Sequence, residues 1–321
     1  AGILLVSAFS SFACGDDGGG EGATEGEASG SEGSSSEASS SDTSTTDASE
    51  STESTSIGDG DGDGDGDGDG ETGPVPDCDN LNPLPLEFNI IEGARRAEDF
   101  VFDAEGHFLS LEGYNLFRTV YGGTYELYIP GVSSGGASGT AMLPNGDLVF
   151  NDVNLGQVTR VTPTGEATAL IGSLPYPNGI QVDDQGWVWV ALNDGDAVIK
   201  FDPDNPVPEV VFESGAPNGL AFSTDYSKLF VGSYNFGGVK MWDLETEELT
   251  IIDDELGGVD GVLTDVCGNI YVTQYGNGLL WRIAPDLTKE IVADLETNWI
   301  PNLNFGSGVG GWEHDRIYVN D

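Results

Sequence analysis

Basic side chains are scarce in this sequence. Its 321 residues include 10 Lys and Arg against 56 Asp and Glu, so the formal net charge is −46. Proteins that bind nucleic acid or an anionic membrane contact phosphate groups with Lys and Arg. The composition therefore argues against nucleic acid and anionic lipid as partners, and it fits an exported protein whose surface must stay soluble.

Histidine and helical patterning are scarce as well. His107 and His314 are the only histidines, so no Ser-His-Asp or Cys-His catalytic set can be assembled, and no Gly-rich phosphate loop is present. No stretch of ten or more residues carries the apolar stripe of an amphipathic helix. An all-β protein is expected.

Residues 1–14 are apolar, rich in small side chains and too short to span a bilayer. They are typical of the end of a secretory signal, and the small residues before Cys14, with Gly15 after it, match a bacterial lipoprotein cleavage box except for Ser11. We expect an exported protein of the bacterial cell envelope, either periplasmic or anchored to the outer membrane by lipid on Cys14. An ordinary signal with an incidental cysteine is the alternative.

Residues 15–77 consist almost entirely of Gly, Ser, Thr, Glu and Asp, with 19 acidic residues and no Lys or Arg. Such a segment cannot bury enough apolar surface to offset its ordering entropy, so it is predicted to be a disordered linker. The Gly-Asp alternation over Gly58–Gly70 has neither the rigid turn nor the apolar support of a calcium loop. It is interpreted as a spacer that binds divalent ions loosely.

From residue 78 onward one pattern recurs about every forty residues. The copies PNGIQVDDQGWVWVALNDGDAVIKFDP from Pro177 and PNGLAFSTDYSKLFVGSYNFGGVKMWD from Pro217 are the most alike. The corresponding positions in all copies are Glu98, Ser138, Asn178, Asn218, Asp260 and Asn302. Each copy contains about four short runs rich in Val, Ile, Phe, Tyr and Trp between Gly, Asp and Asn, as expected for strands and tight turns.

Four-stranded units at this spacing predict a six-bladed β-propeller of antiparallel blades over residues 78–321. The last copy has room for only two strands after Pro301. Leu86–Glu92 could supply an outer strand of that blade, and one strand is still expected to be missing.

The recurring positions begin the first strand of each blade, and first strands line the central channel of a propeller. Glu98, Asn178, Asn218 and Asp260 would then converge at one mouth as two carboxylates and two amides. Oxygen-only ligands with two negative charges suit Ca²⁺ or another hard divalent cation. The alternative is that the Pro-Asn-Gly and Val-Asp-Gly triplets are turns that open a strand.

This order of Glu, Asn, Asn and Asp, which skips the second blade, resembles the family of senescence marker protein, gluconolactonase and luciferin-regenerating enzyme, which includes regucalcin. The resemblance covers about residues 92–321. It implies a six-bladed propeller with a divalent ion on Glu98, Asn178, Asn218 and Asp260, and a monomer that hydrolyses a small lactone or related ester. In family members the ion polarises the ester carbonyl, and the residue that matches Asp260 acts as a general base or as a nucleophile.

Tyr176 departs from the family, because sugar-lactone hydrolases often have Arg at this place. A neutral aromatic cannot form the charged hydrogen bonds of Arg, so Tyr176 is a candidate substrate contact in a more apolar pocket. Trp187, Tyr234, Tyr275 and Trp299 are further candidates, and packing inside the blades is the alternative for each.

Two other functions stay open. One is a surface propeller without enzymatic activity in which calcium joins the blades and another face binds a partner, and the other is a propeller without an ion. Cys78 and Cys267 could form a disulfide in an exported protein, since Cys14 is assigned to the anchor.

Overall fold

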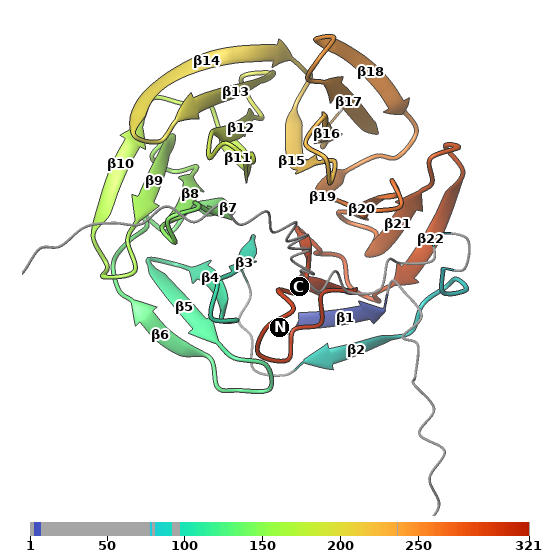
Figure 1. The fold of residues 1–321 in the computed structure, drawn as a ribbon, viewed down its shortest axis with the longest axis horizontal. Helices are drawn as coiled ribbons and strands as arrows, with labels where there is room; N and C mark the ends of the chain where they lie inside the picture. Colours follow the sequence, from blue (N-terminus) through green and yellow to red (C-terminus); the bar gives the residue numbers. More distant parts are fainter. Residues whose placement is uncertain (1–2, 8–77, 79–80, 92–96, 236, 321) are drawn as a thin grey trace, which may run out of the picture. The chain divides into compact units, whose positions relative to one another are not determined.

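Antiparallel strands and turns make up the part of the chain that the structure describes, which is residues 3–7, 78, 81–91, 97–235 and 237–320. This computed structural model contains six sheets of four antiparallel strands, set as a ring around a central axis (Figure 1). No helix long and apolar enough to cross a membrane occurs among these residues. The prediction of an all-β propeller with four-stranded antiparallel blades is confirmed.

Five blades are each built from four consecutive strands. Blade 1 contains β3 (Phe100–Phe102), β4 (Phe108–Glu112), β5 (Asn115–Thr119) and β6 (Glu126–Ile129). Blade 2 contains β7 (Ala137–Met142), β8 (Leu148–Asp152), β9 (Gln157–Val161) and β10 (Ala167–Ile171). Blade 3 contains β11 (Pro177–Val182), β12 (Val188–Leu192), β13 (Ala197–Asp202) and β14 (Asn205–Glu213). Blade 4 contains β15 (Pro217–Phe222), β16 (Lys228–Ser233), β17 (Val239–Asp243) and β18 (Glu248–Asp253). Blade 5 contains β19 (Val259–Thr264), β20 (Ile270–Gln274), β21 (Leu279–Ile283) and β22 (Lys289–Asp294).

The remaining sheet, called here the closing sheet, combines both ends of the chain. Its strand order is β2 (Phe88–Ile91), β1 (Ile3–Ser7), β24 (Arg316–Asn320) and β23 (Leu303–Phe305). The last repeat therefore supplies two strands and the segment before blade 1 supplies the outer one, as the sequence predicted. The expectation of a missing strand is wrong, because β1 pairs in register with both β24 and β2.

This place for Ile3–Ser7 differs from the sequence interpretation, which assigned residues 1–14 to an export signal. The physical reason is the backbone pairing that the two neighbouring strands offer: β24 has an open edge on the side away from β23, and β2 lies one strand further out. An extended run such as ILLVS satisfies the N–H and C=O groups on both sides.

The core is divided among the junctions between neighbouring sheets. Six clusters of buried apolar side chains occur, and each joins two adjacent sheets of the ring. The junction between blade 1 and the closing sheet is aromatic, with Phe100, Phe108, Trp312 and Tyr318 all at most 1% exposed. Trp312 also donates its indole N–H to the carbonyl of Gly106 at 2.9 Å. Apolar packing therefore closes the ring.

A disulfide joins Cys78, which precedes β2, to Cys267 in the turn between β19 and β20, with a Cα–Cα distance of 5.5 Å. It links the segment between β1 and β2 of the closing sheet to blade 5 across 189 residues of sequence.

Candidate metal centre

A β-bulge marks the start of the innermost strand in four consecutive blades. The pairing of β7, β11, β15 and β19 with the next strand shifts register at the same place each time. The shift falls on Ser138-Gly139, Asn178-Gly179, Asn218-Gly219 and Asp260-Gly261. A bulge inserts one residue and re-aims its side chain. The Pro-Asn-Gly and Val-Asp-Gly triplets are thus bulges inside strands, and their interpretation as simple turns is wrong.

The glycine of each bulge allows adjacent inner strands to approach closely. A Cβ on Gly179 would lie 2.0 Å from the carbonyl oxygen of Asn218, and one on Gly219 would lie 2.1 Å from that of Asp260. Gly139 meets the carbonyl of Asn178 in the same way, at 2.3 Å. Only glycine fits these contacts, so the Asn-Gly and Asp-Gly pairs draw neighbouring bulges together at the axis.

Side chains of the second strands hold the bulged backbone in place. Asn151 Nδ2 donates to the carbonyl of Asn178 at 2.5 Å, and the Gly261 N–H donates to Thr273 Oγ1 at 2.7 Å. Buried backbone groups left without ladder partners at a bulge are satisfied in this way.

The four residues predicted as metal ligands line one narrow recess on the axis. Glu98, Asn178, Asn218 and Asp260 come from blades 1, 3, 4 and 5, and Ser138 and Asn302 line the same recess. Asn218 Nδ2 donates to Asp260 Oδ1 at 2.7 Å, which leaves the amide oxygen of Asn218 available to a cation. Asn218 is 3% exposed and Asp260 6% exposed. The structure therefore brings the predicted ligands together, as expected for residues at the same position of each repeat.

Asp99 is a further carboxylate in this recess that the sequence reasoning missed. It accepts hydrogen bonds from the backbone N–H of Thr140 at 2.5 Å and of Phe100 at 2.6 Å, and also from Asn302 Nδ2. Asp99 thus connects blade 1 to blade 2 and to the closing sheet. A signal was present in the sequence, because Asp99 stands where the bulged repeats have glycine.

Negative charge is strongly disfavoured in the recess. Burial, with the nearby Glu98 carboxylate as the next cause, raises the pKa of Asp260 well above its usual range. Burial raises the pKa of Asp99 from 3.8 to about 7, although its three hydrogen bonds oppose the shift. No Lys, Arg or His lines the recess among the described residues. A divalent cation held by these oxygens would stabilise the ionised carboxylates, and oxygen-only donors that include two carboxylates suit a hard cation.

Three tyrosines lie near the mouth above these carboxylates. Tyr176 precedes Pro177 and Asn178, is 45% exposed, and its pKa is raised by burial and by the charges of Glu98, Asp194 and Asp260. The pKa of Tyr234 is raised by burial and by Tyr275, Asp260 and Glu98, and its ring centroid lies 5.6 Å from that of Tyr275.

Tyr176 holds a backbone conformation that is unusual for an aromatic residue. Its φ is 49°, in the left-handed region, and its carbonyl accepts the N–H of Asn193 at 3.0 Å. Ala216 and Gly258, which precede the inner strands of blades 4 and 5 in the same way, have φ values of 42° and 64°. The conformation is therefore a recurring feature of the blades. A non-glycine residue there stores about 1–3 kcal/mol of strain, and such strain concentrates at functional sites.

The other predicted candidates lie elsewhere. Trp187 packs at the junction of blades 3 and 4, in a separate hollow where Lys200 Nζ lies 5.5 Å from its ring centroid, which favours the alternative of packing inside the blades. Trp299 is half-buried and is not among the described residues that line the recess. Cys14 and Gly58–Gly70 fall outside the described residues.

One acidic group away from the axis could also hold a cation. Ligand atoms of Asp103, Glu105 and His107 lie within 4.8 Å of one another in the turn between β3 and β4. Asp103 accepts the backbone N–H groups of Glu105 and His107, and Asp183 and Asp265 make the same turn in blades 3 and 5. Turn formation accounts for this group.

Comparison with known proteins gives relatives in structure alone. No family model matches the sequence, and no curated protein matches it. A gluconolactonase from Xanthomonas campestris superposes with a TM-score of 0.61 and 18% identity over 71% of this chain and 86% of that one. A calcium-binding protein, regucalcin, from Agrobacterium tumefaciens gives a TM-score of 0.56 and 14% identity over 71% and 93%. Virginiamycin B lyase from Staphylococcus aureus superposes with a TM-score of 0.54 and 13% identity over 67% of this chain and 75% of that one. The chain thus has the propeller fold of the family that its sequence pattern resembles.

Proposed function

We propose that this protein is a hydrolase of a lactone or related ester that depends on a divalent cation, with Ca²⁺ as the first candidate. The observation that carries the proposal is the recess on the axis, where Glu98, Asn178, Asn218 and Asp260 gather oxygen donors from four blades. Bound there, the cation would polarise the ester carbonyl. The solved gluconolactonase and regucalcin share the fold that presents such a recess.

Asp260 is assigned as the reacting carboxylate. The Asn218 amide fixes one of its oxygens. A bound divalent cation lowers the pKa of a carboxylate that ligates it, so Asp260 serves as a base only where it holds the ion weakly, and otherwise as a nucleophile. As a base, Asp260 takes the proton of a water whose oxygen attacks the ester carbonyl, the C–O bond of the ring breaks, and the leaving alkoxide is protonated to give a hydroxy acid. As a nucleophile, Asp260 first forms an acyl-enzyme that water then hydrolyses.

Substitution at the recess tests this assignment. Asp260→Asn should lower kcat on the best substrate of a lactone panel by at least about 100-fold, within the range for loss of a general base, and chelation should abolish turnover. Asp184→Asn, at an exposed turn of blade 3, is the matched control and should leave kcat unchanged. Full activity of Asp260→Asn would contradict the assignment, and hydroxylamine capture of an acyl-enzyme would select the nucleophile.

A structural role of the cation is the second candidate. The donors come from four different sheets, so a bound ion would join blades whether or not it catalyses a reaction. In that case chelation lowers the melting temperature, no lactone or phosphotriester is hydrolysed, and another surface binds the partner.

The proposal extends to the cellular location. The composition of residues 1–77 supports an exported protein of the bacterial envelope that reaches the membrane only through lipid on Cys14. Cleavage before Cys14 would remove β1 from the closing sheet. A single molecule can therefore either be cleaved on export or keep the complete closing sheet, but not both. The mass of the N-terminal peptide of the protein from its native host distinguishes them.

A further inference from the structure

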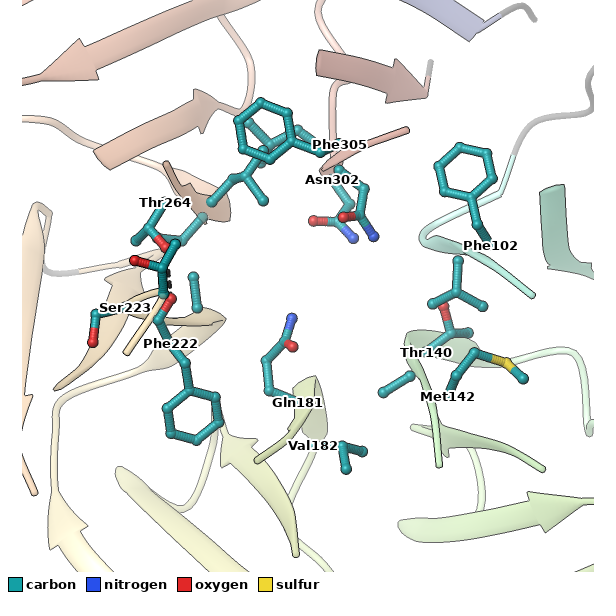
Figure 2. A pocket seen from close by; sticks show the side chains of 18 of the residues that line it. Phe102, Thr140, Met142, Gln181, Val182, Phe222, Ser223, Thr264, Asn302 and Phe305 are labelled. Atoms are coloured by element: carbon teal, nitrogen blue, oxygen red, sulfur yellow. Dashed lines mark hydrogen bonds between the residues drawn. The ribbon is translucent and has the colours of Figure 1, made fainter. Parts of the chain in front are cut away.

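A second, larger cavity opens at the opposite ends of the inner strands. It has a volume of about 550 Å³, whereas the recess with the metal ligands holds about 30 Å³. The recess lies where the inner strands begin, and the cavity lies where they end (Figure 2). Gln181 and Asn302 line both and form part of the partition between them.

The rim of this cavity repeats with the blades. The last residue of every inner strand lines it: Phe102, Met142, Val182, Phe222, Thr264 and Phe305. The aromatic members pack their outer sides between sheets, for example Phe102 against Trp312 with ring centroids 5.0 Å apart. Five of the six remain half-buried, so apolar surface faces the cavity. These five side chains also pack against the clusters between blades, so the ring both closes the blade junctions and faces the cavity.

Charge is absent from the lining. No Asp, Glu, Lys, Arg or His is among the described residues that line the cavity, although the chain carries a net charge of −46. The inner end instead has neutral hydrogen-bonding groups, with Gln181 and Asn302 directed toward the axis in Figure 2.

We propose that this cavity is a second ligand site, separate from the metal centre, for an uncharged small molecule with a flat apolar body and a hydrogen-bonding group at its inner end. Its volume lies within the range of about 300–1,000 Å³ for small-molecule pockets, and its wall combines aromatic and aliphatic side chains with neutral polar groups. A charged ligand would lose its hydration without gaining an ionic partner. The negative field of the chain disfavours anions further.

Fluorescence titration with two related dyes tests the site. The probes are N-phenyl-1-naphthylamine, which is uncharged, and 8-anilinonaphthalene-1-sulfonate, which adds a sulfonate to the same rings. The neutral probe should bind at least about tenfold more tightly, because the lining offers the sulfonate no ionic partner and the negative field of the chain repels it. Binding should be unchanged by chelator and by Asp260→Asn, so the result does not depend on the proposed hydrolase.

Blocking variants locate the bound dye. Val182→Trp fills the cavity and should weaken binding of the neutral dye at least about tenfold, because excess volume in a packed site is poorly accommodated. The matched control is Val207→Trp on β14 of the same blade, where the valine is 68% exposed. If Val182→Trp does not fold, Thr224→Trp at the exposed rim replaces it, with Thr246→Trp in another turn of blade 4 as control. Absence of binding, equal affinity for both dyes, or full affinity in the blocking variants would overturn the proposal.

Discussion

Asp99 should make the stability of the metal-free propeller fall as pH rises. Its pKa is raised from 3.8 to about 7 in the folded protein because the carboxyl group is buried. Between these pH values the folded state binds a proton that the unfolded state has released, so the favourable contribution is complete below pH 3.8 and is lost as pH rises through 7. At about 1.4 kcal/mol per unit of pKa shift, Asp99 contributes about 4 kcal/mol to the free energy of unfolding at low pH, and about 3 kcal/mol of this contribution is lost between pH 5 and pH 8.

The assay is urea unfolding of the chelated protein at pH 5 and pH 8, for the wild type and for Asp99→Asn. Asp260 and the general negative charge act in the same direction, so the wild type alone does not isolate Asp99. The amide that replaces the carboxyl group in Asp99→Asn cannot ionise, so the free energy of unfolding of this variant should decrease by about 3 kcal/mol less over this range than that of the wild type. Loss of a hydrogen-bond acceptor lowers the stability of Asp99→Asn at both pH values and leaves the difference in slope intact.

Added calcium gives the second readout. A cation that binds the ionised carboxylates stabilises the folded state more where protons do not compete, so calcium should raise the unfolding midpoint more at pH 8 than at pH 5. Equal slopes for the wild type and Asp99→Asn would refute the raised pKa. A calcium effect that is independent of pH would refute the role of the recess as a cation site.

Three further outcomes are expected. Tyr176→Gly should raise the free energy of unfolding by up to about 1 kcal/mol in urea, because glycine tolerates a φ of 49°, while it weakens substrate binding measured as KM. Cys78→Ser should lower the free energy of unfolding by about 5 kcal/mol under oxidising conditions, given the 189-residue separation of the linked cysteines, and a reductant should have no effect on this variant. A chain that starts at Gly15 lacks β1, so its backbone amides along β24 should exchange hydrogen faster than in the full chain; unchanged exchange would show that β1 is dispensable to the closing sheet.

The repeat made the blade architecture and the place of the donors predictable from sequence. Residues at one phase of a closed ring must face one another, and Asn178, Asn218 and Asp260 do so. Asp99 was missed because the repeat singles out positions that carry similar residues in every copy. Position 99 has an acid where the bulged copies have glycine, so it does not match that pattern. Its importance depends on burial and on hydrogen bonds to Thr140 and Asn302, which no sequence pattern contains.

The N-terminal strand shows a different limit of sequence analysis. A short apolar run has the same composition whether it is an export signal or a strand buried in a sheet, and Ile3–Ser7 supplies no alternation that separates the two. Its pairing partners, β24 and β2, lie more than 80 residues away in the sequence, and only the incomplete last repeat hinted that a strand was needed.

The bulge in the inner strands of blades 3 to 5 resolves a conflict between packing and chemistry. In a regular strand, alternate side chains share a face, so a donor at Asn178 would place Ile180 on the channel side as well. The extra residue at Gly179 reverses the alternation: Ile180 is 3% exposed in the junction with blade 2, whereas Gln181 lines the channel. Leu220 and Val262 are buried in the corresponding junctions after Asn218 and Asp260. In each of these three strands, one inserted glycine thus lets the same short strand give an oxygen donor to the axis and an apolar side chain to the core.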